Sequence, residues 1–189
     1  MSDWLTWVLV AAVVIGAVVV YLSSAAGRLD RLHHRIETAY AALDAALLRR
    51  AAATQDLASS GFLDPASAFL LSAAAQDSLA VEEGDDASRW VAESELSRTL
   101  GAVLETRDDV QELRDAAGVD AAVCDQLLAE LAAGCRRVEL ARRFHNDVVR
   151  NCTQVRRQRL VRWFRLAGYT PMPATADFDD TPPAGLEGR

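Results

Sequence analysis

The stretch Trp4–Leu22 reads WLTWVLVAAVVIGAVVVYL and carries no charged residue. As an α-helix it would extend about 28 Å, close to the ~30 Å hydrocarbon core of a bilayer. A helix also satisfies its own backbone N–H and C=O groups, as any segment in lipid must. We therefore predict an N-terminal transmembrane anchor over residues 1–24. The side chains expected to contact lipid and its interfaces are Trp4, Trp7, Val8, Val14, Ile15, Val20 and Tyr21.

A cleaved signal peptide and a buried core helix are the alternatives to an anchor. Signal peptides begin with basic residues and have an apolar run of about 7–15 residues. Here Met1–Asp3 contains an acid and no base, and the apolar run is longer, although Ser24–Gly27 has the small residues of a cleavage site. A core helix rarely continues so far without a polar residue. The anchor is favoured, and the signal peptide stays open.

The charges beside this stretch predict its orientation. Asp3 precedes the stretch, whereas Arg28, Arg31 and Arg35 follow it closely. Basic residues near the end of a transmembrane helix favour the cytoplasmic side. We expect a single-pass protein of the cell membrane, with the N-terminus outside and the C-terminal domain in the cytoplasm.

The following segment, residues 25–168, has the pattern of a helical domain. Apolar residues recur every three or four positions through Arg28–Ser60, without Gly or Pro. Asp64 before Pro65, Ser88 and Asp120 are helix-starting residues. These signals predict about four helices, the third running unbroken from Ser88 to Gly118. Short connections predict an all-α fold, an antiparallel up-down helical bundle with coiled-coil-like packing.

Composition narrows the remaining questions. Residues 169–189 are rich in Pro and Asp and are expected to form a disordered or extended tail. A net charge of −7 argues against nucleic acid as a partner. The odd set of Cys124, Cys135 and Cys152 has no C-x-x-C pair, which suits a reducing cytoplasm. Their helical spacing predicts small core residues rather than ligands or nucleophiles.

The end of the last predicted helix, Gln154–Arg165, reads QVRRQRLVRWFR. In an up-down bundle this end returns to the bilayer, where each Arg near an anionic leaflet contributes about 1 kcal/mol. We expect it to contact the membrane surface; the alternative is a solvated basic helix end favoured by the helix dipole. The residues expected in this contact are Arg156, Arg157, Arg159, Arg162, Trp163, Phe164 and Arg165.

Charged residues beside the apolar stripes are expected to form ion pairs between helices, which set register more than they add stability. They are Asp44, Arg50, Arg142 and Asp147. No phosphate-binding loop, H-E-x-x-H or G-x-S-x-G motif is present. His33 and His34 are adjacent, so they point about 100° apart on a helix and cannot share a metal. We expect no enzymatic activity, no cofactor and no metal.

Three stretches resemble the LemA family. RIETAYAALDAALLRR at Arg35–Arg50 is similar to the family's R-V-x-x-A-W/Y-x-x-I/L-D-x-x-L-x-R-R, and ARRFHNDVVR at Ala141–Arg150 is similar to A-R-x-x-Y-N-D-A-V. The third stretch is Ala92–Glu105. Departures are His145 in place of Tyr and the absence of Pro after the Arg pair. The resemblance implies a short external N-terminus, one membrane helix and a cytoplasmic helical bundle, without an established enzymatic activity.

These observations predict a membrane-anchored, non-enzymatic adaptor or scaffold with its bundle on the cytoplasmic side. The alternative is a regulator or sensor of membrane state that acts through the basic end of the last helix. The expected partners are membrane lipids and an unidentified protein. Formation of homo-oligomers is left open.

Overall fold

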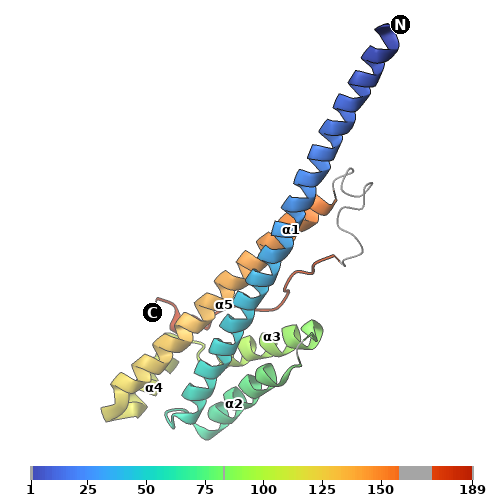
Figure 1. The fold of residues 1–189 in the computed structure, drawn as a ribbon. Helices are drawn as coiled ribbons and strands as arrows, with labels where there is room; N and C mark the ends of the chain where they lie inside the picture. Colours follow the sequence, from blue (N-terminus) through green and yellow to red (C-terminus); the bar gives the residue numbers. More distant parts are fainter. Residues whose placement is uncertain (1, 83, 158–171, 189) are drawn as a thin grey trace. The chain divides into compact units, whose positions relative to one another are not determined.

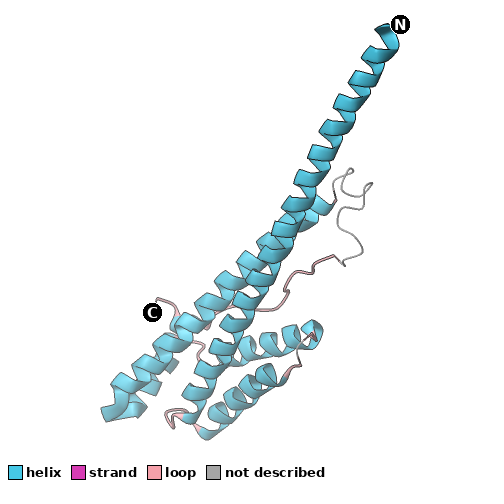
Figure 2. Cartoon of the chain, viewed as in Figure 1, coloured by secondary structure: helices cyan, strands magenta, loops and turns pink. Residues whose placement is uncertain are grey.

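The computed structural model of the chain describes residues 2–82, 84–157 and 172–188. Within these ranges it contains helices and no strand (Figures 1 and 2). The predicted all-α helical bundle is therefore confirmed. The elements are α1 (Ser2–Ser59), α2 (Pro65–Ala80), α3 (Asp86–Val103), α4 (Arg107–Ala117), the 3-10 turn η1 (Gly118–Asp120), α5 (Ala121–Arg156) and the 3-10 turn η2 (Ala184–Leu186).

The chain packs as two units. The first contains Met1–Ala39 and Asn146–Thr175, and the second, the bundle unit, contains Tyr40–His145 and Ala176–Arg189. Both long helices, α1 and α5, contribute to both units. The residues after Thr175, expected as part of a separate tail, thus group with the helices of the bundle unit.

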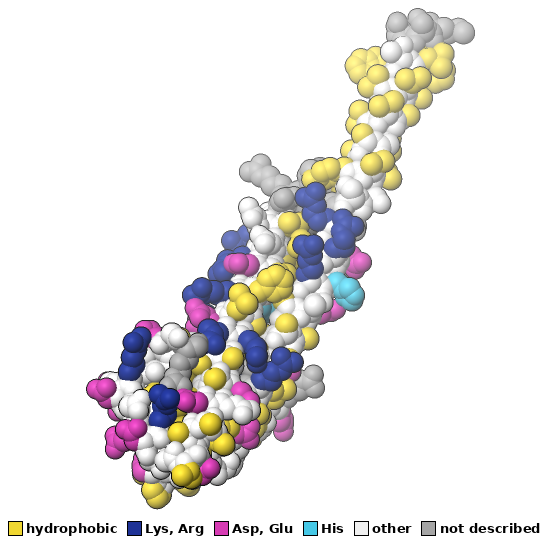
Figure 3. All heavy atoms as spheres, turned by 90° about the vertical axis from the view of Figure 1, so that its left-hand side faces the viewer, with side chains coloured by type: hydrophobic (Ala, Val, Ile, Leu, Met, Phe, Trp, Pro, Cys, Tyr) yellow, Lys and Arg dark blue, Asp and Glu magenta, His cyan; other side chains and the backbone are white. Residues whose placement is uncertain are grey.

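The first unit contains the apolar end of α1. Trp4–Ser24 has a mean hydropathy of 2.6 and no buried residue, so this helix is long and apolar enough to cross a membrane. Figure 3 shows hydrophobic side chains gathered on this end of the helix, whereas charges of both signs cover much of the rest of the molecule. The side chains predicted to contact lipid are all exposed: Trp4, Trp7, Val8, Val14, Ile15, Val20 and Tyr21.

The core of the bundle unit is built from all five helices. In the bundle unit, α1 and α5 run antiparallel and α2 packs beside α3 (Figure 1). The main cluster includes fully buried leucines such as Leu57, Leu71, Leu100 and Leu128. Full burial of a leucine side chain contributes roughly 1.5–3 kcal/mol. Two of the three cysteines, Cys124 and Cys135, belong to this cluster, and all three cysteines are buried thiols outside any disulfide of the described residues.

The third helix expected from the sequence is divided in the structure. α3 ends at Val103, and α4 begins at Arg107. Thr106 caps α4: its hydroxyl accepts a hydrogen bond from the Asp109 amide (3.2 Å), and the Asp109 carboxylate accepts one from the Thr106 amide (2.7 Å). This reciprocal capping box stabilises a new helix start. The expectation of one helix from Ser88 to Gly118 was therefore wrong.

Helices α1 and α5 lie close together beside Gly134. A Cβ atom at this position would lie 3.4 Å from the Cα atom of Arg50. An alanine would therefore fit at ordinary contact distance, whereas a branched side chain would press against the α1 backbone. The absence of a side chain at Gly134 therefore lets α5 pack directly against the backbone of α1.

Gly134→Val is expected to reduce the free energy of unfolding by about 1–3 kcal/mol, because its methyl groups overpack the contact with α1. Gly134→Ala should stay within about 1 kcal/mol of the parent chain. Gly101→Val on α3 is the control, since a Cβ atom there meets no heavy atom within 4 Å. Chemical unfolding followed by circular dichroism measures all three. Equal losses for the two valine variants would contradict the close approach.

Candidate functional site

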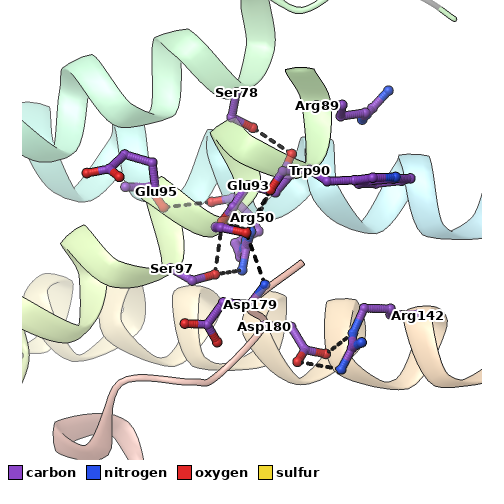
Figure 4. A network of polar contacts seen from close by, with 12 residues as sticks. Arg50, Ser78, Arg89, Trp90, Glu93, Glu95, Ser97, Arg142, Asp179 and Asp180 are labelled. Atoms are coloured by element: carbon purple, nitrogen blue, oxygen red, sulfur yellow. Dashed lines mark hydrogen bonds and ion pairs between the residues drawn. The ribbon is translucent and has the colours of Figure 1, made fainter. Parts of the chain in front are cut away.

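Arg50, predicted from the sequence as an inter-helix partner, lies at the centre of a buried polar network (Figure 4). Its Nη2 donates to Glu93 Oε2 (2.6 Å), and its Nη1 donates to Ser97 Oγ (2.8 Å). Glu93 Oε1 accepts a further hydrogen bond from Ser78 Oγ (2.7 Å). The two charged side chains are only 1% and 0% exposed. The network therefore ties together α1, α2 and α3 inside the core.

Helical spacing explains why both charges are inside. Arg50 follows Leu43 and Leu47 on the apolar stripe of α1, and Glu93 precedes Leu96 and Leu100 on that of α3. A charge within such a stripe must be paired and hydrogen-bonded, because burying an isolated ion is very unfavourable. Sequence reasoning missed Glu93, Ser78 and Ser97. The position of Glu93 in the stripe was the available signal.

The other three predicted ion-pair residues have different partners. Asp44 pairs with Arg89 of α3 at 2.5 Å, which is an inter-helix pair. Arg142 pairs with Asp180 of the C-terminal segment rather than with a helix. Asp147 pairs with Arg150 of its own helix, α5, so the expectation of an inter-helix pair was wrong at this position. The reason is its exposed position, where a basic residue three positions along the same helix is the nearest partner.

Tyr40 of α1 adds a polar contact near the start of α3. Its hydroxyl donates to Asp86 Oδ1 at 2.7 Å. Its ring meets the ring of His145 edge-on, with 5.8 Å between the centroids. Burial, followed by the hydrogen bond and the charge of Asp86, raises the pKa of Tyr40 to about 12. Folding therefore favours the neutral phenol.

This pKa predicts a loss of stability at high pH. A group whose pKa is raised in the folded state contributes stability that is complete below its unfolded pKa, about 10, and is lost as pH rises toward the folded value. We expect the free energy of unfolding to fall between about pH 10 and pH 12, and to fall less in Tyr40→Phe. Denaturant unfolding at a series of pH values measures the difference. Identical profiles for the two chains would contradict it.

An open groove lies between α1 and α5 of the bundle unit, with a volume of about 550 Å³. Its floor is alanine and glycine. Since Gly134 lies opposite Arg50, the antiparallel helices place Arg49 and Arg137 toward one end, and Asp56 and Glu130 toward the other. The lining residues are Arg49, Ala52, Ala53, Asp56, Gln126, Ala129, Glu130, Ala133, Gly134 and Arg137.

The charges of this α1–α5 groove are largely unsatisfied. Within the described ranges, the side chains of Arg49, Asp56 and Arg137 form no hydrogen bond or ion pair, and Glu130 accepts only from the Gln126 amide of its own helix. Exposed apolar side chains continue the same helical faces beyond the arginine end: Leu48, Leu140 and Phe144, which are 45%, 70% and 56% exposed. The groove thus has an apolar floor, basic side chains toward one end and acidic side chains toward the other.

The C-terminal segment, defined here as Ala176–Gly188, packs against α3, α4 and α5. It takes the extended form, one of the two forms expected for the tail, and lies along the helices. Phe178 stacks on Trp90 with 5.1 Å between ring centroids. Arg142 lies over the ring of Phe178 and donates two hydrogen bonds to Asp180, at 2.7 and 2.8 Å (Figure 4).

The far end of the C-terminal segment is held by close backbone packing. The Gly185 amide donates to the Leu104 carbonyl at 3.1 Å. A Cβ atom on Gly185 would lie 2.7 Å from that carbonyl oxygen, 3.0 Å from Val110 Cγ2 and even closer to the Thr106 carbonyl oxygen. Leu186 beside it belongs to the main core cluster. Sequence reasoning missed this docking, whose only signals were the isolated Phe178 and Leu186 in a polar tail.

The predicted membrane-surface residues are only partly described. Arg159, Arg162, Trp163, Phe164 and Arg165 lie outside the described residues. Arg157 is exposed at the end of α5, whereas Arg156 is only 9% exposed. Arg156 shares a helical face with buried Val149 and Cys152, which explains its burial and corrects the expectation of a surface contact at this position.

The described residues offer little chemistry of other kinds. No group of three or more His, Cys, Asp or Glu side chains among them could hold a metal ion. Burial raises the pKa of the Cys135 and Cys152 thiols, which disfavours the reactive thiolate. The fold and site define an all-α protein with an apolar N-terminal helix and a helical unit that carries an open groove and a docked C-terminal segment. Comparison with protein-family models, curated proteins and solved structures gave no match.

Proposed function

We propose that the protein is a membrane-anchored, LemA-like, non-enzymatic adaptor whose helical unit binds a protein partner on the cytoplasmic side. The observation that carries this proposal is the α1–α5 groove. It combines an open apolar floor with the charged side chains of Arg49, Asp56 and Arg137, which form no hydrogen bond or ion pair in the described part of the chain. A surface of this kind is typical of an interaction site.

The proposed occupant is one helix of a partner protein, lying along the groove. A floor of Ala52, Ala129 and Ala133 allows helix axes to approach closely, at about 8–10 Å. The charges of the groove determine the direction in which the partner helix lies. Acidic side chains of the partner would face Arg49 and Arg137, and basic side chains would face the end with Asp56 and Glu130. Its larger apolar side chains would contact the exposed Leu140 and Phe144.

Site-specific photo-crosslinking in intact native membranes tests this partner. Probes replace Ala52 and Ala133 in the groove, and a control probe replaces Val119, which is fully exposed outside it. We expect one dominant protein adduct from both groove positions and none from Val119. Arg137→Glu should weaken the adduct, because it reverses the charge at one end. Adducts of equal yield at Val119, or lipid adducts alone, would overturn the proposal.

The proposed anchor rests on the apolar Trp4–Ser24 stretch and the arginines that follow it. We expect the full chain to remain in membranes at alkaline pH, and a chain lacking residues 2–24 to be released completely. Mass spectrometry of the N-terminus separates a retained anchor from a cleaved signal peptide. Protease should reach the C-terminus of the chain only from the cytoplasmic side. Protection on that side would reverse the proposed orientation.

A further inference from the structure

The C-terminal segment divides into two parts that are held in different ways. The distal part, around Gly185 and Leu186, fits flush against the backbone between α3 and α4 and joins the core. The proximal part, Ala176–Thr181, places Ala176 and Phe178 in a second buried cluster with Leu43 and Leu47 of α1 and Val138 of α5. Both parts are therefore embedded, and the proximal part is also held by side-chain contacts with α3 and α5.

The contacts of the proximal part are those of peptide recognition. Trp90 offers a flat face to Phe178, Arg142 clamps Asp180 through two hydrogen bonds, and Ser94 Oγ accepts from the Asp179 amide at 3.1 Å. An aromatic anchor, a paired arginine–carboxylate contact and a backbone hydrogen bond together read both side-chain type and spacing. The receiving side chains all come from rigid helices, α3 and α5.

The docked segment contains a local turn held by its own side chains. Asp179 Oδ1 accepts hydrogen bonds from the Thr181 amide (3.0 Å) and from the Thr181 hydroxyl (2.7 Å), which closes a local turn. These two bonds lower the pKa of Asp179. Pro182 and Pro183 follow this turn and restrict the backbone conformations of the unbound segment. Such restriction reduces the entropy lost on binding.

We propose that the surface formed by Trp90, Ser94 and Arg142 is a recognition site for short acidic peptides with an aromatic residue followed, two positions later, by an aspartate. The chain's own Phe178–Asp180 occupies this site intramolecularly. A partner protein carrying a segment of the same chemistry displaces it. This site is separate from the α1–α5 groove and does not depend on the adaptor proposal.

Intramolecular occupancy sets how strongly a free peptide binds. A tethered segment has an effective concentration in the millimolar range. The apparent dissociation constant of an external peptide equals its intrinsic value divided by the fraction of time that the site is free, so a site that is mostly occupied binds the peptide weakly. Weakening the tethered contacts should therefore reveal binding of a peptide in solution. The distal part, anchored by Leu186, should meanwhile keep the helical unit folded.

The test uses the full chain in detergent micelles and a fluorescent peptide of residues 174–189 as the probe. We expect the double variant Phe178→Ala, Asp180→Asn to bind the peptide at least ten-fold more tightly than the parent chain. Adding Arg142→Gln to this variant should abolish the gain, and a peptide with the same two changes as the tail should not bind. Fluorescence anisotropy measures each affinity.

A matched control comes from the same segment. Asp177 is exposed, and its side chain forms no hydrogen bond or ion pair within the described residues, so Asp177→Asn removes one negative charge, as Asp180→Asn does, without opening the site. This single variant, with Phe178 and Asp180 unchanged, should bind the peptide like the parent chain. A folded double variant of Phe178 and Asp180 that binds no peptide, or a gain that survives Arg142→Gln, would overturn the proposal. Circular dichroism verifies folding in each case.

Discussion

Replacing Glu93 with Gln is expected to lower the free energy of unfolding by about 3–5 kcal/mol, because it leaves the Arg50 guanidinium buried without a counter-charge. Arg50 is 1% exposed and its Nη2 atom lies 2.6 Å from Glu93 Oε2. Because both side chains are almost fully buried, water cannot solvate the guanidinium in place of the lost carboxylate. The neutral amide of Gln still accepts a hydrogen bond, yet it does not offset the cost of keeping the guanidinium out of water.

Denaturant unfolding of the full chain in detergent micelles, followed by circular dichroism, measures this loss. Glu95→Gln is the matched control, since Glu95 lies on the same helix, is 56% exposed and pairs only with Arg98 one turn away. Its effect should stay within about 0.5 kcal/mol. Arg50→Met combined with Glu93→Leu should recover more than half of the loss, because both charges are removed. An effect of Glu93→Gln no larger than that of Glu95→Gln would contradict the buried pair.

Gly185→Ala is expected to release the C-terminal segment from the helices. The added Cβ atom would meet the carbonyl oxygens of Thr106 and Leu104, which belong to the backbone and cannot turn away. Relieving that clash breaks the hydrogen bond from the Gly185 amide to Leu104 and withdraws Leu186 from the core. We expect a cost of about 1–3 kcal/mol, of the size found for overpacked contacts.

Hydrogen exchange of residues 176–188 measures the release directly. In Gly185→Ala these amides should exchange much faster, while the amides in the middle of α5 keep their protection. Gly101→Ala adds the same methyl group where nothing lies within 4 Å and should raise stability slightly through helix propensity. Unchanged exchange in the segment would mean that the close packing around Gly185 does not hold it.

Features that depend on nearby residues were predictable. The three-and-four spacing of apolar residues predicted helices, and the uncharged Trp4–Leu22 stretch predicted a helix of membrane-spanning length. The break at Thr106 was also local, because its spacing to Asp109 is that of a capping box, yet the apolar spacing continued across it and hid it. Continuity of a stripe does not require continuity of the helix.

Contacts between residues far apart in the sequence were not predictable. The sequence showed that Arg50 and Arg142 lie beside apolar stripes, but their partners, Glu93 and Asp180, are 43 and 38 positions away. Richness in Pro and Asp predicted a disordered or extended tail. Composition describes only the segment itself, whereas Trp90 and the main core cluster supply the surfaces that Phe178 and Leu186 cover.

The sequence by itself determined the helical class, the apolar N-terminal helix and the inward-facing residues, because these follow from periodicity and local capping. Only the tertiary structure decided that Arg50 meets Glu93, that α1 and α5 leave a charged groove open, and that the C-terminal segment docks. Each of these depends on which helix faces are brought together in space. Ion pairing, burial and shape complementarity each involve two surfaces, so they cannot be read from the sequence of one surface alone.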